Sequence, residues 1–155
     1  MEQKTKIEVE NGKQDLLITR EFDLPIELLF KAYVESEIVA QWMETKVLKL
    51  ESKKHGSYLF ETTDQHGNIQ FKANGVIHEF KINQKITRTF EMDNSPFGVQ
   101  LEVYEFEKLT DNTCKLNMHI IYESILQRDQ LLKLPFSQGL NMAHNRLQDI
   151  VNKLK

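Results

Sequence analysis

Residues 136–154, FSQGLNMAHNRLQDIVNKL, carry the helical pattern that decides the fold. Its apolar residues recur at spacings of three and four, which places them on one face of a helix roughly four turns long. This face consists of Leu140, Ala143, Leu147, Ile150, Val151 and Leu154. The helical pattern extends back to Gln127, but Pro135 lies inside it. Because proline disrupts a helix interior, regular helix is expected to begin near Phe136.

Toward the N-terminus the apolar period changes to two over residues 46–123, which indicates β-strands. Short turns separate these strands, and short turns require antiparallel neighbours. The expected strands cover residues 47–50, 57–62, 69–82, 85–92, 98–108 and 113–123, and an earlier strand covers 16–22. Gly75 indicates a bulge or bend within its strand. The pattern predicts a six-stranded antiparallel meander joined by the first strand.

Two short helices are expected between residues 25 and 43. Pro25 suits a first helical turn, and Ser36 suits the N-cap of a second helix that ends at Met43. A curved sheet needs its concave face covered, and only the C-terminal helix is long enough to do so. We therefore expect an α+β fold in which a curved antiparallel sheet wraps a long C-terminal helix. The fold forms a single domain over residues 1–155, and residues 1–14 are expected to be flexible or loosely attached.

Composition excludes several classes of function. The net charge is −3 and no basic block occurs, which argues against nucleic-acid binding. No apolar run approaches the roughly 20 residues of a membrane-spanning helix, and residues 1–9 lack the apolar core of a signal peptide. We expect a cytoplasmic protein. Cys114 is the single cysteine, so no internal disulfide can form, and its apolar strand favours a buried role.

The chain resembles the activator of heat-shock protein ATPase (Aha-type) homologue-like family, within the START-like or SRPBCC superfamily. The residues that carry this resemblance are Ile18–Asp23, Pro25, Glu27–Ala32, Ser36–Glu37, Trp42, Gly56, Tyr58, Phe60, Gly75–Ile77, Thr113–Met118, Gly139–Leu140 and Asn145–Leu147. The resemblance implies a helix-grip fold. Because one helix cannot fill the concave face of a strongly bent sheet, we also expect a cavity beneath the final helix. The sequence departs from the family pattern at Met43, Arg88 and Leu140, near the expected cavity.

The expected ligand site lies between the sheet and the C-terminal helix. Its candidate residues are Trp42, Tyr58, Phe60, Phe71, Arg88, Phe90, Leu101, Met118, Leu140, Ala143 and Leu147. Mostly apolar walls with a few polar groups are typical of small-molecule sites. The same residues could instead make a filled core, and the sequence leaves that alternative open.

Arg88 is the charged member of this set. It alternates with Ile86 and Phe90, so it shares their face of the strand. A guanidinium that enters the concave face must be paired or must contact an anion. One hypothesis is a ligand that carries a carboxylate or phosphate. The alternatives are that this face points outward, or that Arg88 pairs with a strand neighbour such as Glu102.

No pattern of catalytic, metal-binding or phosphate-binding residues occurs. The five histidines lack metal-ligand spacing, and neither a nucleophile elbow nor a glycine-rich phosphate loop is present. We therefore predict no metal, cofactor or catalytic residue. The first expectation is a protein that binds or carries a small hydrophobic or amphipathic molecule, acidic if Arg88 contacts it. The alternative is a chaperone-associated interaction domain, and the third is an enzyme that uses the same cavity.

Overall fold

The computed structural model describes residues 4–155, within which the chain forms eight strands and four helices. The strands are β1 (Lys6–Glu8), β2 (Asp15–Phe22), β3 (Lys46–Leu50), β4 (Ser57–Thr63), β5 (Ile69–Lys81), β6 (Lys85–Met92), β7 (Val99–Lys108) and β8 (Cys114–Ile121). The helices are α1 (Ile26–Val34), α2 (Ser36–Trp42), α3 (Ile125–Leu132) and α4 (Phe136–Asn152). Within residues 4–155, none of these helices combines the length and the apolar character that a bilayer crossing requires.

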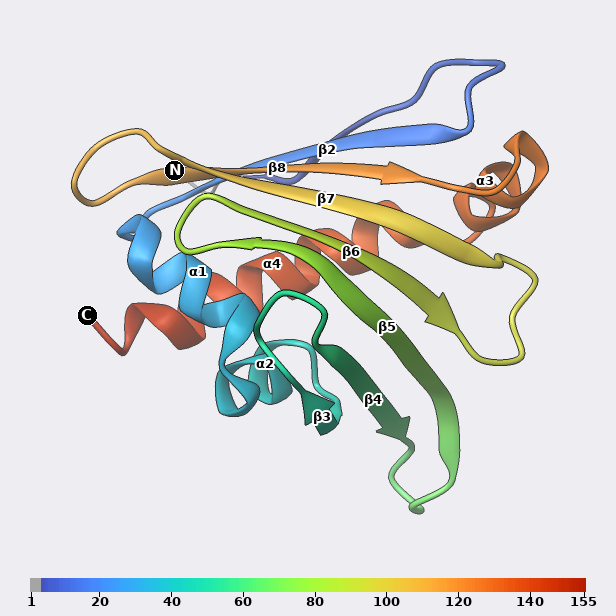
Figure 1. Ribbon diagram of the computed structural model, residues 1–155, viewed down its shortest axis with the longest axis horizontal. Coiled ribbons are helices and arrows are strands. Elements are labelled where there is room, and N and C mark those ends of the chain that lie inside the picture. Colours follow the sequence, from blue (N-terminus) through green and yellow to red (C-terminus); the bar gives the residue numbers. More distant parts are fainter. Residues whose placement is uncertain (1–3) are drawn as a thin grey trace.

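All the strands belong to one antiparallel sheet, in the order β1-β2-β8-β7-β6-β5-β4-β3. The predicted meander is confirmed as β3 to β8, and the predicted first strand is β2, which pairs with β8. The sheet curves over α4, and α1 and α2 lie at one end of it (Figure 1). The predicted α+β fold, a curved antiparallel sheet around a long C-terminal helix, is therefore confirmed.

The N-terminal segment is attached to the sheet more closely than the sequence predicted. β1 pairs with β2 through Lys6 and Thr19, and the Thr5 backbone N–H donates to Asn141 Oδ1 at 3.0 Å. Residues 5–8, part of the segment expected to be flexible or loosely attached, are thus hydrogen-bonded to β2 and α4, and the mobility of the segment stays a prediction. Three residues are too few for a period-two pattern to stand out. Residues 1–3 lie outside the described part of the chain.

Irregular pairing bends the sheet at its β3–β5 end. The register shifts between Val47 and Lys49, between Thr62 and Thr63, and between Ile77 and Glu79. An extra residue on one strand bends that strand and increases its twist. The bend predicted near Gly75 lies two residues further along β5.

α4 covers the concave face, and its two halves pack differently. Leu147 and Val151, in the second half, are completely buried in the core. Pro135 separates α4 from α3, so the predicted start of regular helix near Phe136 is confirmed. Cys114 is buried in the same core, as its apolar strand predicted.

Position 75 requires glycine because the Tyr58 side chain and the backbone of β6 lie directly against it. A Cβ atom at Gly75 would collide with the Thr89 carbonyl oxygen and with the Tyr58 side chain. We expect Gly75→Ala to lower the free energy of unfolding by at least about 2 kcal/mol, because the backbone oxygen cannot move aside. Urea denaturation measures this change.

Gly139→Ala is the matched control. Apart from the adjoining residues and backbone of α4 itself, no described atom lies within 4 Å of a Cβ built at Gly139. Because alanine is the better helix former, this variant is expected to gain about 0.5–1 kcal/mol. Equal destabilisation of the two variants would contradict the assignment of Gly75 to a close-packed position.

Candidate ligand cavity

A cavity of about 290 Å³ lies between the sheet and the first half of α4. Its floor is formed by side chains at alternate positions of adjacent strands, which therefore share the concave face of the sheet. The floor residues are Ile18 on β2, Arg88, Phe90 and Met92 on β6, Gln100, Glu102 and Tyr104 on β7, and Met118 and Ile120 on β8.

The helices form the roof and one end of the cavity. Phe136, Leu140 and Ala143 follow one another along one face of α4, and all three border the space. The end wall near α1 and α2 consists of Tyr33, Trp42 and Met43. The remaining lining residues are Phe97 and Gly98 in the β6–β7 turn, Tyr122 after β8, and Leu131 on α3.

The structure brings six of the predicted site residues together at the cavity. They are Trp42, Arg88, Phe90, Met118, Leu140 and Ala143. Tyr58, Phe60 and Leu147 are buried in the core but do not border the cavity. The rings of Tyr58 and Phe60 pack on each other, with centroids 5.1 Å apart. The Tyr58 ring also lies against Arg88, so the two rings fill the core on that side of the cavity.

Phe71 and Leu101 were placed wrongly by the sequence pattern. Leu101 is 37% exposed, because the buried face of β7 carries Glu102 and Tyr104, and a shift of one residue moves a side chain to the opposite face. Phe71 is 40% exposed, because it lies on the part of the β4–β5 hairpin that extends away from the helices (Figure 1). Neither residue belongs to the cavity.

The sequence analysis left several lining residues out of the site, among them Tyr104, and it named Glu102 only as a possible partner of Arg88. They alternate with Phe106 on β7, and all three are buried. That alternation was visible in the sequence. It was overlooked because Leu101 is apolar and Glu102 is charged, and charged residues are seldom buried unless they are paired.

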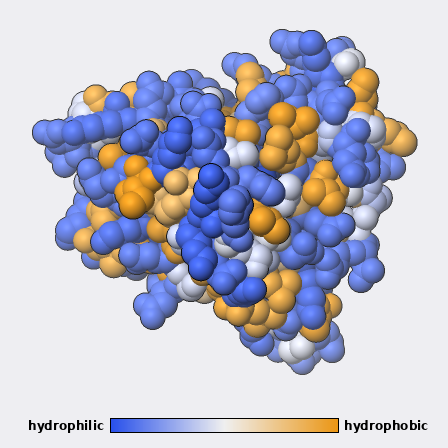
Figure 2. Space-filling model, viewed as in Figure 1, coloured by the Kyte–Doolittle hydropathy of each residue, from blue (hydrophilic) through white to orange (hydrophobic). Residues whose placement is uncertain are grey.

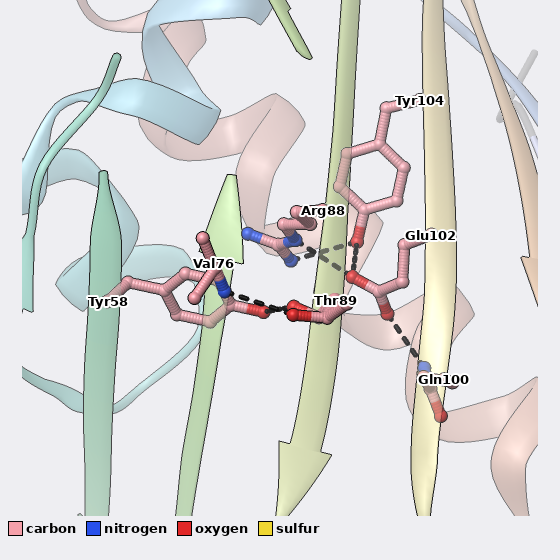
Figure 3. Close-up of polar contacts among 7 residues, drawn as sticks. All are labelled: Tyr58, Val76, Arg88, Thr89, Gln100, Glu102 and Tyr104. Atoms are coloured by element: carbon pink, nitrogen blue, oxygen red, sulfur yellow. Dashed lines mark hydrogen bonds and ion pairs between the residues drawn. The ribbon is translucent and has the colours of Figure 1, made fainter. Parts of the chain in front are cut away.

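Arg88 and Glu102 form a buried ion pair inside a connected network (Figure 3). Arg88 Nε donates to Glu102 Oε1 at 2.8 Å, and Arg88 Nη2 donates to the Tyr104 hydroxyl at 2.9 Å. That hydroxyl donates to Glu102 Oε1 at 2.8 Å, and Gln100 Nε2 donates to Glu102 Oε2 at 2.7 Å. The carboxylate therefore accepts three hydrogen bonds from three side chains.

Aromatic rings enclose the guanidinium of Arg88. Its Cζ atom lies 4.8 Å from the ring centroid of Tyr58 and 4.9 Å from that of Tyr104. Such cation–π contacts are strongest when water is excluded. Of the alternatives left open by the sequence, pairing with Glu102 is the one that the structure shows. Arg88 does not need an anionic ligand for its charge to be matched.

Two tyrosine hydroxyls beside the cavity are buried without a hydrogen-bond partner among residues 4–155, those of Tyr33 and Tyr122. Burial raises the pKa of each hydroxyl well above its usual value, so both stay neutral. Their rings line the cavity while their oxygens are packed against other protein atoms. The tyrosines therefore act as large, mostly apolar wall residues.

A second polar cluster lies between the start of the sheet and α4, outside the cavity. Arg20 Nη2 donates to Asn145 Oδ1 at 2.9 Å, and Thr5 Oγ1 lies 2.7 Å from His144 Nδ1. His144 is completely buried. Burial, with a smaller contribution from the charge of Arg20, lowers the pKa of His144 to about 3. His144 is therefore a neutral core residue at neutral pH.

The same part of the chain, residues 4–155, contains no group of three or more His, Cys, Asp or Glu side chains arranged to hold a metal ion.

The family model described as activator of Hsp90 ATPase homolog 1-like protein matches residues 23–152. The chain belongs to this family. The match includes the β6–β8 floor, both short helices and α4, so it covers most of the cavity wall. Met43, Arg88 and Leu140, at which the sequence analysis expects departures from the family pattern, all border the cavity.

Solved structures confirm the fold over nearly the whole chain. A Rhodobacter sphaeroides protein aligns with a TM-score of 0.86 at 16% identity, covering 97% of this chain and 99% of the other. An Arthrobacter aurescens protein gives 0.85 at 12% identity, covering 96% and 91%. A Staphylococcus epidermidis protein gives 0.78 at 19% identity, covering 95% and 94%. At such identities the likeness concerns the fold alone. Comparison with curated proteins gives no match.

Removing one partner of the buried ion pair is expected to be costly. Arg88→Met leaves Glu102 buried without its counter-charge, and we expect a loss of about 3–5 kcal/mol in the free energy of unfolding. The double variant Arg88→Met/Glu102→Gln removes both charges and is expected to recover most of that loss. Urea denaturation of the single and double variants forms a double-mutant cycle. Additive effects would contradict the coupling.

The buried His144 predicts a dependence of stability on pH. Its pKa is lower in the folded protein than in the unfolded chain, so the unfolded chain binds more protons as the pH falls below about 6.5. Stability is therefore expected to fall by about 1.4 kcal/mol between about pH 7.5 and about pH 5.5.

The variant His144→Met is expected to lose this dependence over the same interval, because methionine does not titrate. His66→Gln is the matched control, since His66 is exposed in the β4–β5 turn. It is expected to keep the dependence of the parent. Thermal unfolding at each pH measures the difference, and an unchanged slope in His144→Met would contradict the assignment.

Proposed function

We propose that the protein binds a small, largely apolar molecule in the cavity beneath the first half of α4. The observation that carries this proposal is the mostly apolar space of about 290 Å³ between the sheet and the first half of α4, which is partly open to the surface. Native interiors hold few voids larger than a water molecule, because each void forfeits contacts between atoms. An occupant would restore those contacts.

The size and walls of the cavity define what fits. An apolar cavity of roughly 150 Å³ holds a benzene molecule, so the present space has room for about two fused rings. It lies at the lower end of the roughly 300–1,000 Å³ range of small-molecule sites. Its walls include the rings of Trp42, Phe90, Phe97 and Phe136. Aromatic walls favour a ligand that contains a ring.

Binding is favoured over catalysis by the state of the charged groups. Catalysis of proton transfer requires titratable groups that are free to exchange a proton with the substrate. Arg88 and Glu102 instead engage each other, and Tyr104 bonds to both. This arrangement supports a role for the network in holding a ligand.

The family description supports a second candidate, association with a chaperone ATPase. Such a role needs an exposed docking surface. On the outer face of the sheet, Leu17, Val76 and Leu101 are 36–45% exposed. In Figure 2 the apolar side chains form separate groups with hydrophilic residues between them. Stimulation of a chaperone's ATP hydrolysis by the purified protein would support this candidate, and no stimulation would leave the cavity as the functional site.

Trp42 provides a direct test of ligand binding. It is the single tryptophan in the sequence, it borders the cavity, and its indole N–H donates to the Ala32 carbonyl oxygen at 2.6 Å. A ¹⁵N–¹H spectrum therefore contains one indole signal at the end wall of the cavity. Titration with naphthalene, a two-ring probe, is expected to shift this signal saturably.

Variants at two sites then locate the binding. Ala143→Phe places a ring into the cavity from α4 and is expected to weaken naphthalene binding at least about tenfold. Leu101→Phe, on the outer face of the sheet, is expected to bind naphthalene as the parent does. The proposal fails if naphthalene does not bind the parent, or if Ala143→Phe binds it as tightly as the parent.

A further inference from the structure

We propose that the cavity selects an uncharged ligand with a ring-containing body and one hydroxyl or amide group, and that this group contacts the network of Arg88, Glu102 and Gln100. The inference rests on the proposed function, because it specifies the chemistry of the molecule that the cavity binds. It replaces the acidic ligand that the sequence suggested.

The first argument is charge. Among the described residues that line the cavity, Arg88 and Glu102 are the two charged ones. Their charges are opposite and only 2.8 Å apart, so the wall as a whole is neutral. A charged ligand would lose its hydration without meeting an unmatched counter-charge, and burial of an unmatched charge is strongly unfavourable. An uncharged ligand avoids this cost.

The second argument is hydrogen bonding. The network brings donors and an acceptor to the same wall: the guanidinium of Arg88, the amide of Gln100 and the carboxylate of Glu102. Arg88 and Glu102 keep 7% and 5% of their surface exposed, and both border the cavity. A carboxylate has about four acceptor sites, of which three are used here. A hydroxyl or an amide can both donate and accept, so it suits this wall better than a purely apolar group.

The third argument is position. Gln100, Glu102 and Tyr104 succeed one another at alternate positions of β7, so their side chains form one polar strip along the floor (Figure 3). The roof opposite consists of apolar side chains from α4, namely Phe136, Leu140 and Ala143. A ligand that bears its polar group at one edge of a ring system can satisfy both surfaces at once.

The test compares three probes that share a two-ring body: naphthalene, 2-naphthol and 2-naphthoate. In the parent protein, 2-naphthol is expected to bind about two- to tenfold more tightly than naphthalene, the usual net gain from one hydrogen bond. 2-Naphthoate is expected to bind at least about tenfold more weakly than 2-naphthol, because its charge is unmatched. The Trp42 indole signal and calorimetry report each affinity.

Glu102→Gln should remove the preference of the cavity for 2-naphthol over 2-naphthoate. This variant leaves the charge of Arg88 unmatched in the wall, so binding of 2-naphthoate is expected to strengthen at least about tenfold, while naphthalene binding changes little. Glu105→Gln is the matched control, because Glu105 is exposed on the same strand, and it should rank the probes as the parent does. The double variant Arg88→Met/Glu102→Gln keeps the wall neutral and should still reject 2-naphthoate.

The outcomes separate this inference from the proposed function. Tight binding of 2-naphthoate to the parent overturns the inference, as does equal binding of naphthalene and 2-naphthol. Neither result affects the cavity as a binding site. Failure of all three probes to bind overturns the proposed function as well. The ranking in the parent decides the inference even if Glu102→Gln fails to fold.

Discussion

The concave face of an eight-stranded sheet must be covered by α4 together with α1 at one end, and the rest of the structure depends on this constraint. The second half of α4 packs closely on the concave face, where Leu147 and Val151 are completely buried. Over its first half the side chains do not reach the floor, and the cavity remains. The register shifts of β3, β4 and β5 lie at the other end of the sheet, outside the floor that β2, β6, β7 and β8 form.

The buried ion pair gives the cavity its chemical character. Arg88 on β6 and Glu102 on β7 are directly paired in the sheet register, so the backbone alone brings the two side chains together. Tyr104 and the ring of Tyr58 then surround the guanidinium. A buried pair of this kind costs desolvation and adds little net stability compared with apolar residues of the same size. In the proposed function, the pair instead offers a polar contact to the occupant of the cavity.

The sequence predicted the fold well and the site in part. The meander and the break at Pro135 follow from local patterns, namely the period of two, the short turns and the helical spacing of α4. β1 was missed because three residues cannot display a period. At the site, Leu101 is predicted to line the cavity because it is apolar. Alternation along β7 instead places Glu102 on the buried face and Leu101 on the outer face. Phe71 shows a different limit: alternation identifies the face of a strand but not how far the covering helix extends. The volume of a cavity depends on side chains from many elements, so no local pattern in the sequence predicts it.

The interruption at Pro135 has a consequence for access to the interior. α3 contributes one buried side chain, Arg128, which donates to the Glu10 carbonyl oxygen at 2.7 Å and so ties α3 to the segment before β2. α4 contributes three buried side chains, His144, Leu147 and Val151, which hold its middle and second half in the core. Local opening costs least where the fewest side chains leave the core. Leu131 of α3 borders the cavity, so a sub-global opening that releases Arg128 would widen the access to it while α4 stays folded.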